Sequence, residues 1–194
     1  MNGITAGTAP VVTVFGSSRV GPGDGEYEIA LRLGHLIGER GWVLCNGGYN
    51  GTMEAAARGA KEAGGSTIGV TVTVYDKVQA NPWLDQIIVA PTLFNRLEQL
   101  ISLARAYVVL RGGIGTLLEL AMIWNAVQTE PQSKPILVVG PEWDSILDRL
   151  YESLPMHPWE ADSLTRVPSI EGAISELDRF FQGLCQPDAS PPSF

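Results

Sequence analysis

The stretch that decides the fold is "LRGGIGTLLELAMIWNAVQ", which runs from Leu110 to Gln128. Three glycines and a threonine separate an apolar run typical of a strand from an apolar run typical of a helix. Between Arg111 and Glu130, the only charged side chain is that of Glu119. A carboxylate in so apolar a helix is costly unless it is paired or faces a wet pocket. Glu119 is therefore a candidate functional residue.

Strand-like and helix-like segments alternate on both sides of this stretch. Strands are predicted at 11–15, 42–45, 67–72, 86–90, 107–110 and 136–139, and helices at 27–37, 52–63, 92–105, 117–127, 143–153 and 170–184. The strands are continuous apolar runs, as expected when helices cover both faces of a parallel sheet. The sequence thus predicts an α/β fold, a Rossmann-like, doubly wound parallel sheet with helices on both faces. The long connection 73–85 is expected to form a lid or a pocket wall.

The length of 194 residues fits a single nucleotide-binding domain over 10–186. Residues 1–9 are expected to be a flexible N-terminus, and residues 187–194 a disordered tail. The formal net charge is −8, and no basic stripe is visible, which argues against binding to a nucleic acid polymer. No apolar run is long enough to cross a bilayer, so we expect no membrane partner.

The few cysteines and histidines favour a reduced compartment and argue against a metal site. Cys45 and Cys185 are far apart and form no C-x-x-C motif, so the expected location is the cytoplasm. His35 and His157 have no neighbours of the kind that bind zinc. We therefore expect neither a metal nor another cofactor.

Glycine-rich loops follow three of the predicted strands. In doubly wound sheets ligands bind at the carboxyl ends of strands, and a glycine loop at a helix N-terminus can hold a phosphate with backbone N–H groups. Three such loops on one sheet edge predict an anionic, nucleotide-like ligand. The candidate binding residues are Gly16, Ser17, Ser18, Gly47, Gly48, Gly112, Gly113, Gly115 and Thr116.

Two interpretations of the charged candidates stay open. Thr116 and Glu119 fit the S/T-x-x-E capping box, and a capping role can coexist with catalysis. Arg96 lies in the first turn of the helix beginning near Thr92, where a cation opposes the helix dipole. Arg96 is either a surface arginine that pairs with Glu98, or it shares a cleft with Glu119 and a bound phosphate or ribose.

The helix from Leu117 to Val127 is apolar on all sides, apart from Glu119. A helix without a polar face is expected to be covered by a second subunit as well as by the sheet. The sequence therefore predicts a homodimer.

Residues 111–119 resemble the PGGxGTxxE signature of the LOG (Lonely Guy) family. Arg96 stands at the matching position upstream, and segments 14–18 and 47–53 match in order and place, so the resemblance covers roughly 11–139. It implies a Rossmann-like dimer. It also implies cleavage of the N-glycosidic bond of a nucleoside 5′-monophosphate, such as AMP or a related purine ribotide, to free base and ribose 5-phosphate, without metal or redox cofactor.

The resemblance also implies roles for individual residues. Gly112, Gly113, Gly115 and Thr116 would hold the 5′-phosphate, Ser17 and Gly48 would line the ribose and phosphate side, and Arg96 and Glu119 would form the catalytic pair. In glycosidic cleavage a carboxylate near the anomeric carbon stabilises an oxocarbenium-like state or activates water.

Several positions depart from the family pattern: Arg111 replaces a proline, Leu118 a glutamate, Leu97 a lysine, and Asn46 and Glu54 glycines. These departures leave an alternative open, in which the protein is a non-catalytic carrier of a nucleotide or of the molybdenum cofactor, a pterin phosphate. Arg111 either adds a phosphate contact or is solvated at the rim. A nicotinamide-dependent oxidoreductase is disfavoured, because the second strand ends without an acidic residue for a ribose diol.

Overall fold

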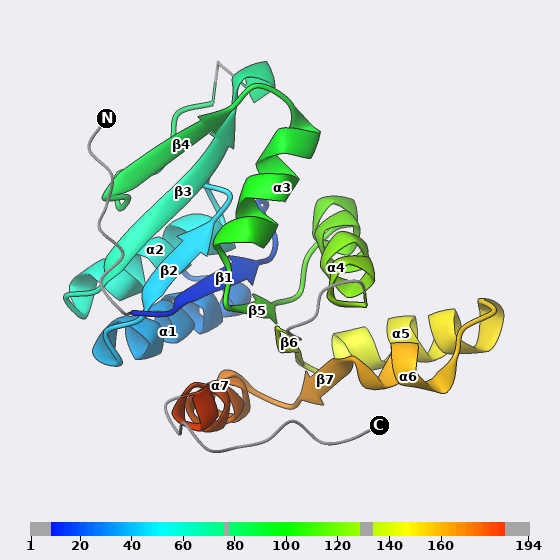
Figure 1. Ribbon diagram of the computed structural model, residues 1–194. Helices are drawn as coiled ribbons and strands as arrows, with labels where there is room; N and C mark the ends of the chain where they lie inside the picture. Colours follow the sequence, from blue (N-terminus) through cyan, green and yellow to red (C-terminus); the bar gives the residue numbers. More distant parts are fainter. Residues whose placement is uncertain (1–8, 76–77, 129–133, 185–194) are drawn as a thin grey trace.

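The computed structural model describes residues 9–75, 78–128 and 134–184, which contain a parallel sheet of seven strands (Figure 1). The strands are β1 (Val11–Phe15), β2 (Val43–Asn46), β3 (Ser66–Val72), β4 (Gln86–Ala90), β5 (Ala106–Val109), β6 (Ile136–Val139) and β7 (Leu164–Val167). The helices are α1 (Gly25–Glu39), α2 (Thr52–Glu62), α3 (Leu93–Leu103), α4 (Ile114–Val127), α5 (Glu142–Ser153), α6 (Pro158–Asp162) and α7 (Ile170–Leu184), with a 3-10 turn, η1 (Thr73–Tyr75).

The strand order β4-β3-β2-β1-β5-β6-β7 confirms the predicted doubly wound sheet. From β1 the chain moves outward to β4, then returns to place β5 on the other side of β1. The direction of winding therefore reverses between β1 and β5. In open α/β sheets the crevice at such a switch point, outside the carboxyl ends of the strands, is where ligands bind.

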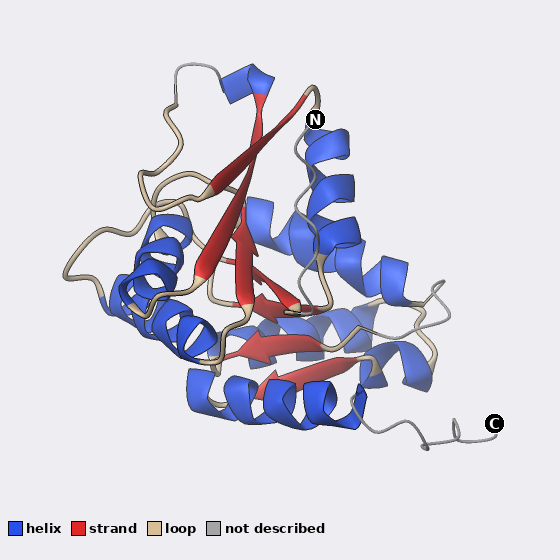
Figure 2. Cartoon of the chain, turned by 60° about the vertical axis from the view of Figure 1, so that its left-hand side comes forward, coloured by secondary structure: helices blue, strands red, loops and turns tan. Residues whose placement is uncertain are grey.

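Helices cover both faces of the sheet, as predicted (Figure 2). Successive side chains of a strand point to opposite faces, so Val14 packs with α1, α2 and α7, whereas Phe15 packs with α3, α4 and α5. Both groups of side chains are buried, which explains why the strands are continuous apolar runs.

Two elements at the sheet edge, α6 and β7, were not predicted. The strand β7 has the sequence Leu-Thr-Arg-Val, and only its first and last residues are buried. Because β7 pairs with β6 alone, it lacks the continuous apolar pattern of the inner strands. The terminal segments expected to be flexible lie outside the described residues, apart from Ala9.

In the single chain α4 is only partly covered, and its burial against a second subunit stays a prediction. Leu120, Ile123 and Trp124 are buried, but Leu118 and Met122 are exposed. In the part of the chain that the structure describes, no helix is both long and apolar enough to cross a membrane.

Candidate functional site

A cleft of about 670 Å³ lies at the switch point, beside the carboxyl ends of β1 and β2 and the N-terminus of α4. Most of the residues predicted from the sequence line it: Gly16, Ser17, Ser18, Gly47, Arg96, Gly113, Gly115, Thr116 and Glu119. Two predicted residues, Gly48 and Gly112, are not among its lining residues. The topology thus brings together segments that are up to a hundred residues apart in the chain.

Gly48 and Gly112 shape the loops instead of lining the cleft. The φ angle of Gly48 is +78°, a conformation that L side chains rarely adopt. Its N–H donates a 2.8 Å hydrogen bond to Oδ1 of Asn46, whose amide in turn donates to the carbonyl of Met53. A Cβ on Gly112 would overlap the Thr116 side chain. Asn46, one of the departures from the family pattern, therefore holds its loop in place.

Hydrogen bonds join the loop after β1 to its neighbours. The Thr116 hydroxyl donates to the Gly16 carbonyl at 3.0 Å, and the Thr52 N–H donates to the Ser17 carbonyl at 2.8 Å. These contacts fix the β1 loop between the first turns of α4 and α2. The wall of the cleft is therefore preformed.

The first turn of α4 is open to a ligand. A Cβ built on Gly113 or Gly115 would meet nothing within 4 Å, so packing does not require glycine at either position. The first N–H groups of a helix have no partner within the helix and carry the positive end of its dipole. This turn therefore has the features of an anion site whose backbone a ligand can approach closely.

Arg96 is held by backbone carbonyls rather than by solvent. Its Nε donates to the Val70 carbonyl at 2.7 Å, and its Nη2 donates to the Gly47 carbonyl at 3.2 Å. The guanidinium also lies over the ring of Tyr49, 5.8 Å from its centroid. A Cβ on Gly47 would overlap Nη2, so only glycine leaves room for this arginine. The alternative of a surface arginine paired with Glu98 is wrong.

Glu119 lies next to Arg96 in the cleft. Its Oε1 is 3.7 Å from Nη1 of Arg96, and the two side chains are only 15% and 11% exposed. Burial raises the pKa of Glu119 to about 7, and the positive charge of Arg96 opposes that rise. At neutral pH this carboxyl group can therefore hold or release a proton.

The capping-box interpretation of Glu119 is wrong. The helix begins at Ile114 with Gly113 as its N-cap, and the Thr116 hydroxyl bonds to the β1 loop. Glu119 consequently stands in the second turn, beyond reach of a capping role.

Sequence reasoning missed part of the cleft wall: Val14, Phe15, Arg19, Tyr49, Met53, Tyr75, Val78 and Ile114. Tyr75 and Val78 come from the long connection expected to be a lid or pocket wall. The Tyr49 hydroxyl accepts from the Val72 N–H at 2.9 Å, and its ring meets that of Tyr75 edge to face at 5.8 Å. Arg19 directly follows the predicted Gly16–Ser18 loop, and this place in the sequence could have identified it as a lining residue.

Arg111 lies outside the cleft. Its guanidinium forms a 2.7 Å ion pair with Glu26, and its side chain is 59% exposed. Of the two options for Arg111, the geometry therefore supports a solvated position at a rim and not a phosphate contact. Within 9–75, 78–128 and 134–184, no group of three or more His, Cys, Asp or Glu side chains is arranged to hold a metal ion.

Known proteins resemble the part of the chain that contains the cleft. The model of the SLOG cluster4 family matches residues 9–155. A cytokinin riboside 5′-monophosphate phosphoribohydrolase of Mycobacterium tuberculosis is 32% identical over 76% of this chain and 82% of that protein. A pyrimidine/purine nucleotide 5′-monophosphate nucleosidase of Escherichia coli is 26% identical over 78% of this chain and 36% of that protein.

The solved structures include a molybdenum cofactor binding protein from Rippkaea orientalis. It superposes with a TM-score of 0.71 and 26% identity, over 89% of this chain and 98% of that one. The fold is therefore shared between proteins named as hydrolases and a protein named as a cofactor binder.

Proposed function

The chain belongs to the SLOG cluster4 family, and on that premise we propose that it is a nucleoside 5′-monophosphate phosphoribohydrolase. It would cleave the N-glycosidic bond of a nucleotide such as AMP to free base and ribose 5-phosphate. The observation that carries the proposal is the buried pair of Arg96 and Glu119, which shares one cleft with the open first turn of α4. The names of the Mycobacterium and Escherichia relatives support the same reaction class.

The 5′-phosphate would bind at the N-terminus of α4. The backbone N–H groups of Gly115 and Thr116 belong to its first turn, and the space around Gly113 and Gly115 is open. Ser17 and Gly16 border the same space from the β1 loop. No cation is needed at such a site, because the helix dipole and the unpaired N–H groups favour a dianion.

The sugar would then reach Glu119. A helix rises about 1.5 Å per residue, so Glu119 lies roughly 7.5 Å along α4 from Ile114. As a carboxylate, Glu119 would stabilise the positive charge that develops at the anomeric carbon, or take a proton from the attacking water. Water adds its oxygen to that carbon, and the base leaves with the bonding electrons and a proton. Arg96 would orient the carboxylate from its fixed position on the Val70 and Gly47 carbonyls.

The base would stack against the wall formed by Tyr49, Met53, Tyr75 and Val78. Tyr75 and Val78 are each 45% exposed, so these two side chains are available to a ligand. An aromatic and aliphatic wall favours a flat, apolar ring such as a purine.

We also propose that two chains associate through α4 and the start of α3. Ile114 and Phe94 are 81% and 79% exposed, and Leu118 and Met122 extend the apolar surface along α4. Exposed apolar side chains grouped in this way are typical of a protein interface. The cytoplasmic location stays a prediction from the sequence.

The direct test is to incubate the protein with a panel of nucleoside 5′-monophosphates and separate the products by chromatography. We expect free base and ribose 5-phosphate in equal amounts, and no release from the corresponding nucleosides, which lack the phosphate. Glu119→Gln serves as the inactive control. If folded protein releases base from none of the monophosphates, the proposal is wrong.

A second candidate is a carrier of a nucleotide-like ligand or of the molybdenum cofactor, a pterin phosphate. The likeness to the Rippkaea orientalis protein favours it, since the two superpose over 89% of this chain and 98% of that one. Calorimetry distinguishes the candidates. A carrier would bind its ligand tightly without turnover, and Glu119→Gln would leave that affinity unchanged.

A further inference from the structure

The strand β3 continues beyond the end of its neighbour β2. Pairing between the two strands ends at Asn46 and Gly69, whereas β3 runs on to Val72. Val70 and Val72 are both buried. Backbone N–H and C=O groups that are buried need hydrogen-bond partners, so the end of β3 must find them outside β2.

Two side chains that line the cleft supply these partners. The Arg96 Nε donates to the Val70 carbonyl at 2.7 Å. The Tyr49 hydroxyl accepts from the Val72 N–H at 2.9 Å and donates to the Val72 carbonyl at 3.2 Å, since a phenol can do both. The guanidinium lies 5.8 Å from the centroid of the Tyr49 ring, within the range of a cation–π contact.

Tyr49 also connects the two segments that hold Arg96. One acceptor of the guanidinium is the Gly47 carbonyl, two residues before Tyr49, and the other is the Val70 carbonyl, two residues before Val72. The hydroxyl bonds of Tyr49 therefore tie the loop after β2 to the end of β3 around the guanidinium. The remaining nitrogen, Nη1, is the one that lies 3.7 Å from Oε1 of Glu119.

The backbone of Tyr49 is fixed as well. The buried Asn81 side chain donates from Nδ2 to the Tyr49 carbonyl at 3.0 Å, and the Asn81 N–H donates to the Gly48 carbonyl at 2.9 Å. A Cβ on Gly48 would lie 2.9 Å from the Thr71 side chain, so this loop packs closely against β3. The Tyr49 ring thus has little freedom to move relative to the guanidinium.

The position of the guanidinium affects the charge of Glu119. The attraction between two opposite charges falls as their separation grows, and it is strong where water is largely excluded. The Arg96 and Glu119 side chains are only 11% and 15% exposed. A residue that fixes the guanidinium therefore influences how readily Glu119 holds its proton.

We propose that Tyr49 is a positioning residue, which holds the guanidinium of Arg96 against the carboxyl group of Glu119. Its consequence for catalysis rests on the proposed hydrolase function, whereas the effect on Glu119 does not. Satisfying the Val72 backbone would be a purely structural role, and that role would make no use of the ring beside the guanidinium. The two roles differ in whether the effect of Tyr49 on Glu119 passes through Arg96.

The first test follows the titration of Glu119 in the ligand-free protein by carbon NMR of its carboxyl group, which is identified by its loss in Glu119→Gln. Tyr49→Leu removes both the ring and the hydroxyl. It should raise the midpoint by roughly 0.5 in pH, because a displaced guanidinium stabilises the carboxylate less. Tyr49→Phe keeps the ring and loses the hydroxyl, so it should raise the midpoint by less.

The same substitutions in the Arg96→Met background separate positioning from structure. There they should leave the midpoint where Arg96→Met alone puts it, since the group that Tyr49 positions is absent. An equal shift in both backgrounds would show a direct effect of Tyr49 and overturn the proposal. If Tyr49→Leu does not fold, Tyr49→Phe decides, and an unchanged midpoint in that variant overturns the proposal too.

A matched control lies outside the cleft. The Arg166 guanidinium is 5.1 Å from the centroid of the Tyr151 ring, so Tyr151→Leu removes a similar contact far from Glu119 in the sheet order. This variant should leave the Glu119 titration unchanged. A shift as large as that of Tyr49→Leu would show that the loss of any such ring perturbs Glu119, and the proposal would fail.

Kinetics with AMP test the catalytic consequence. Tyr49→Phe should lower kcat about three- to tenfold and leave KM within about twofold, because the aromatic wall of the cleft is kept. A raised KM with an unchanged kcat would assign Tyr49 to substrate binding alone and contradict a positioning role. The NMR titrations need no substrate. If no monophosphate is hydrolysed, the hydrolase proposal fails while the titrations still decide the role of Tyr49.

Discussion

The Glu119 carboxyl group is buried without a hydrogen bond to its nearest cation. The nearest cation, Arg96, is 3.7 Å away, too far for a hydrogen bond, and two of its donor atoms, Nε and Nη2, are bound to the Val70 and Gly47 carbonyls. Burial therefore outweighs the attraction of the guanidinium, and the pKa of Glu119 rises to about 7. The protonation of Glu119 should therefore respond to small changes in its surroundings. Three predictions at the scale of the side chain rest on this.

The first concerns the pH dependence of base release. If the carboxylate is the active form, kcat/KM should increase as the pH rises through about 7, the pKa of Glu119 in the free protein. Glu119→Gln should lower kcat/KM by about 10²- to 10⁴-fold and abolish this limb of the profile. Measurements of base release between pH 5 and 9 provide the check. A variant that keeps the wild-type profile would exclude Glu119 from the reaction.

The second concerns stability. The folded-state pKa of Glu119 lies above its ordinary value of 4.5, so the folded protein binds the proton more tightly than the unfolded chain does. Its contribution is complete below pH 4.5 and is lost as the pH rises through about 7. Glu119→Gln should therefore be more stable than wild type at pH 8, by up to about 3 kcal/mol, and similar at pH 4.5.

Urea unfolding at the two pH values measures this difference. Glu62→Gln, which removes an exposed carboxylate on α2, is the control and should show no such pH-dependent gain. Equal stabilities of Glu119→Gln and wild type at pH 8 would mean that the buried carboxyl group carries no penalty.

The third concerns Arg96. Its positive charge lowers the pKa of Glu119, so Arg96→Met should move the rising limb of the pH profile to higher pH. Arg96→Lys keeps the charge but loses the pattern of contacts to the Val70 and Gly47 carbonyls. We expect the lysine variant to retain a limb near its wild-type position with a lower kcat/KM. A limb that moves equally in both variants would contradict a role for the charge.

At the scale of elements, the glycines of the loops fall into two kinds. Gly47 is required by packing, because any side chain there overlaps the guanidinium of Arg96. Gly115 stands in the first turn of α4, where a Cβ would meet nothing within 4 Å, so packing does not require glycine there.

Alanine at these two positions should therefore have opposite effects on stability. Gly47→Ala should destabilise the fold by about 1–3 kcal/mol and displace Arg96. Gly115→Ala should leave stability unchanged or raise it by roughly 0.5–1 kcal/mol, since alanine favours a helix, while it weakens nucleotide binding. Thermal unfolding and calorimetry with AMP measure the two quantities. Unweakened binding in the Gly115 variant would place the phosphate elsewhere.

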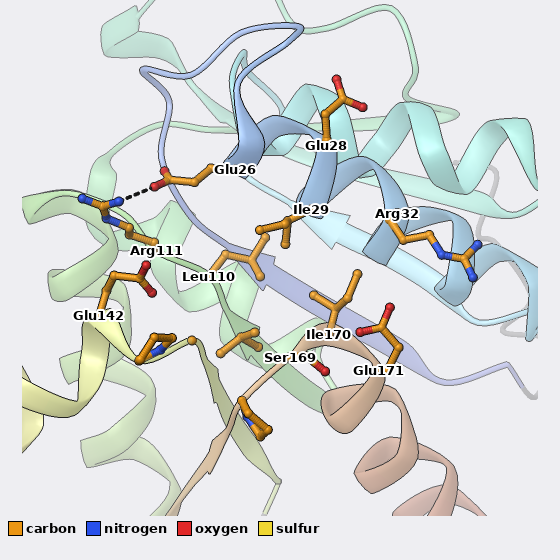
Figure 3. A pocket seen from close by; sticks show the side chains of 14 residues that line it. Glu26, Glu28, Ile29, Arg32, Leu110, Arg111, Glu142, Ser169, Ile170 and Glu171 are labelled. Atoms are coloured by element: carbon orange, nitrogen blue, oxygen red, sulfur yellow. Dashed lines mark hydrogen bonds and ion pairs between the residues drawn. The ribbon is translucent and has the colours of Figure 1, made fainter.

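At the scale of the molecule, the loop that begins at Arg111 separates two cavities. The candidate cleft lies on the α3 and α4 side. The other cavity, of about 480 Å³ and with Glu26, Ile29 and Ile170 among its lining residues, lies on the α1 and α7 side (Figure 3). The exposed apolar surface of α4 borders the cleft, and Ile114 belongs to both. Association through α4 would therefore bring a second chain to the mouth of the cleft.

This gives a prediction for assembly. Light scattering should show a dimer for the wild type and a monomer for Leu118→Glu, because a charge buried at an apolar interface is strongly unfavourable. Ile146→Glu, on α5, is the matched control: Ile146 is 44% exposed and lies off the proposed interface, so that variant should stay dimeric. A monomeric wild-type mass would refute the homodimer.

Most of the architecture could be predicted from local patterns. Continuous apolar strands, helical periodicity and glycine loops are properties of neighbouring residues, and they indicated the doubly wound sheet and the strand ends where the cleft lies. The strand β7 was missed because it lacks the continuous apolar pattern on which these predictions rest. An edge strand is buried by one neighbour only, and its sequence, Leu-Thr-Arg-Val, lacks the pattern of an inner strand.

The chain's sequence by itself determined which chemical groups stand at the strand ends: the lone acid of α4, the arginine of α3 and the open glycines between strand and helix. Only the tertiary structure decided how they meet. It placed Arg96 on the carbonyls of Val70 and Gly47 and aimed it at Glu119, and it turned Arg111 away towards Glu26. The physical reason is that burial and ion pairing depend on separations in space between segments far apart in the chain, and local sequence patterns do not encode these separations.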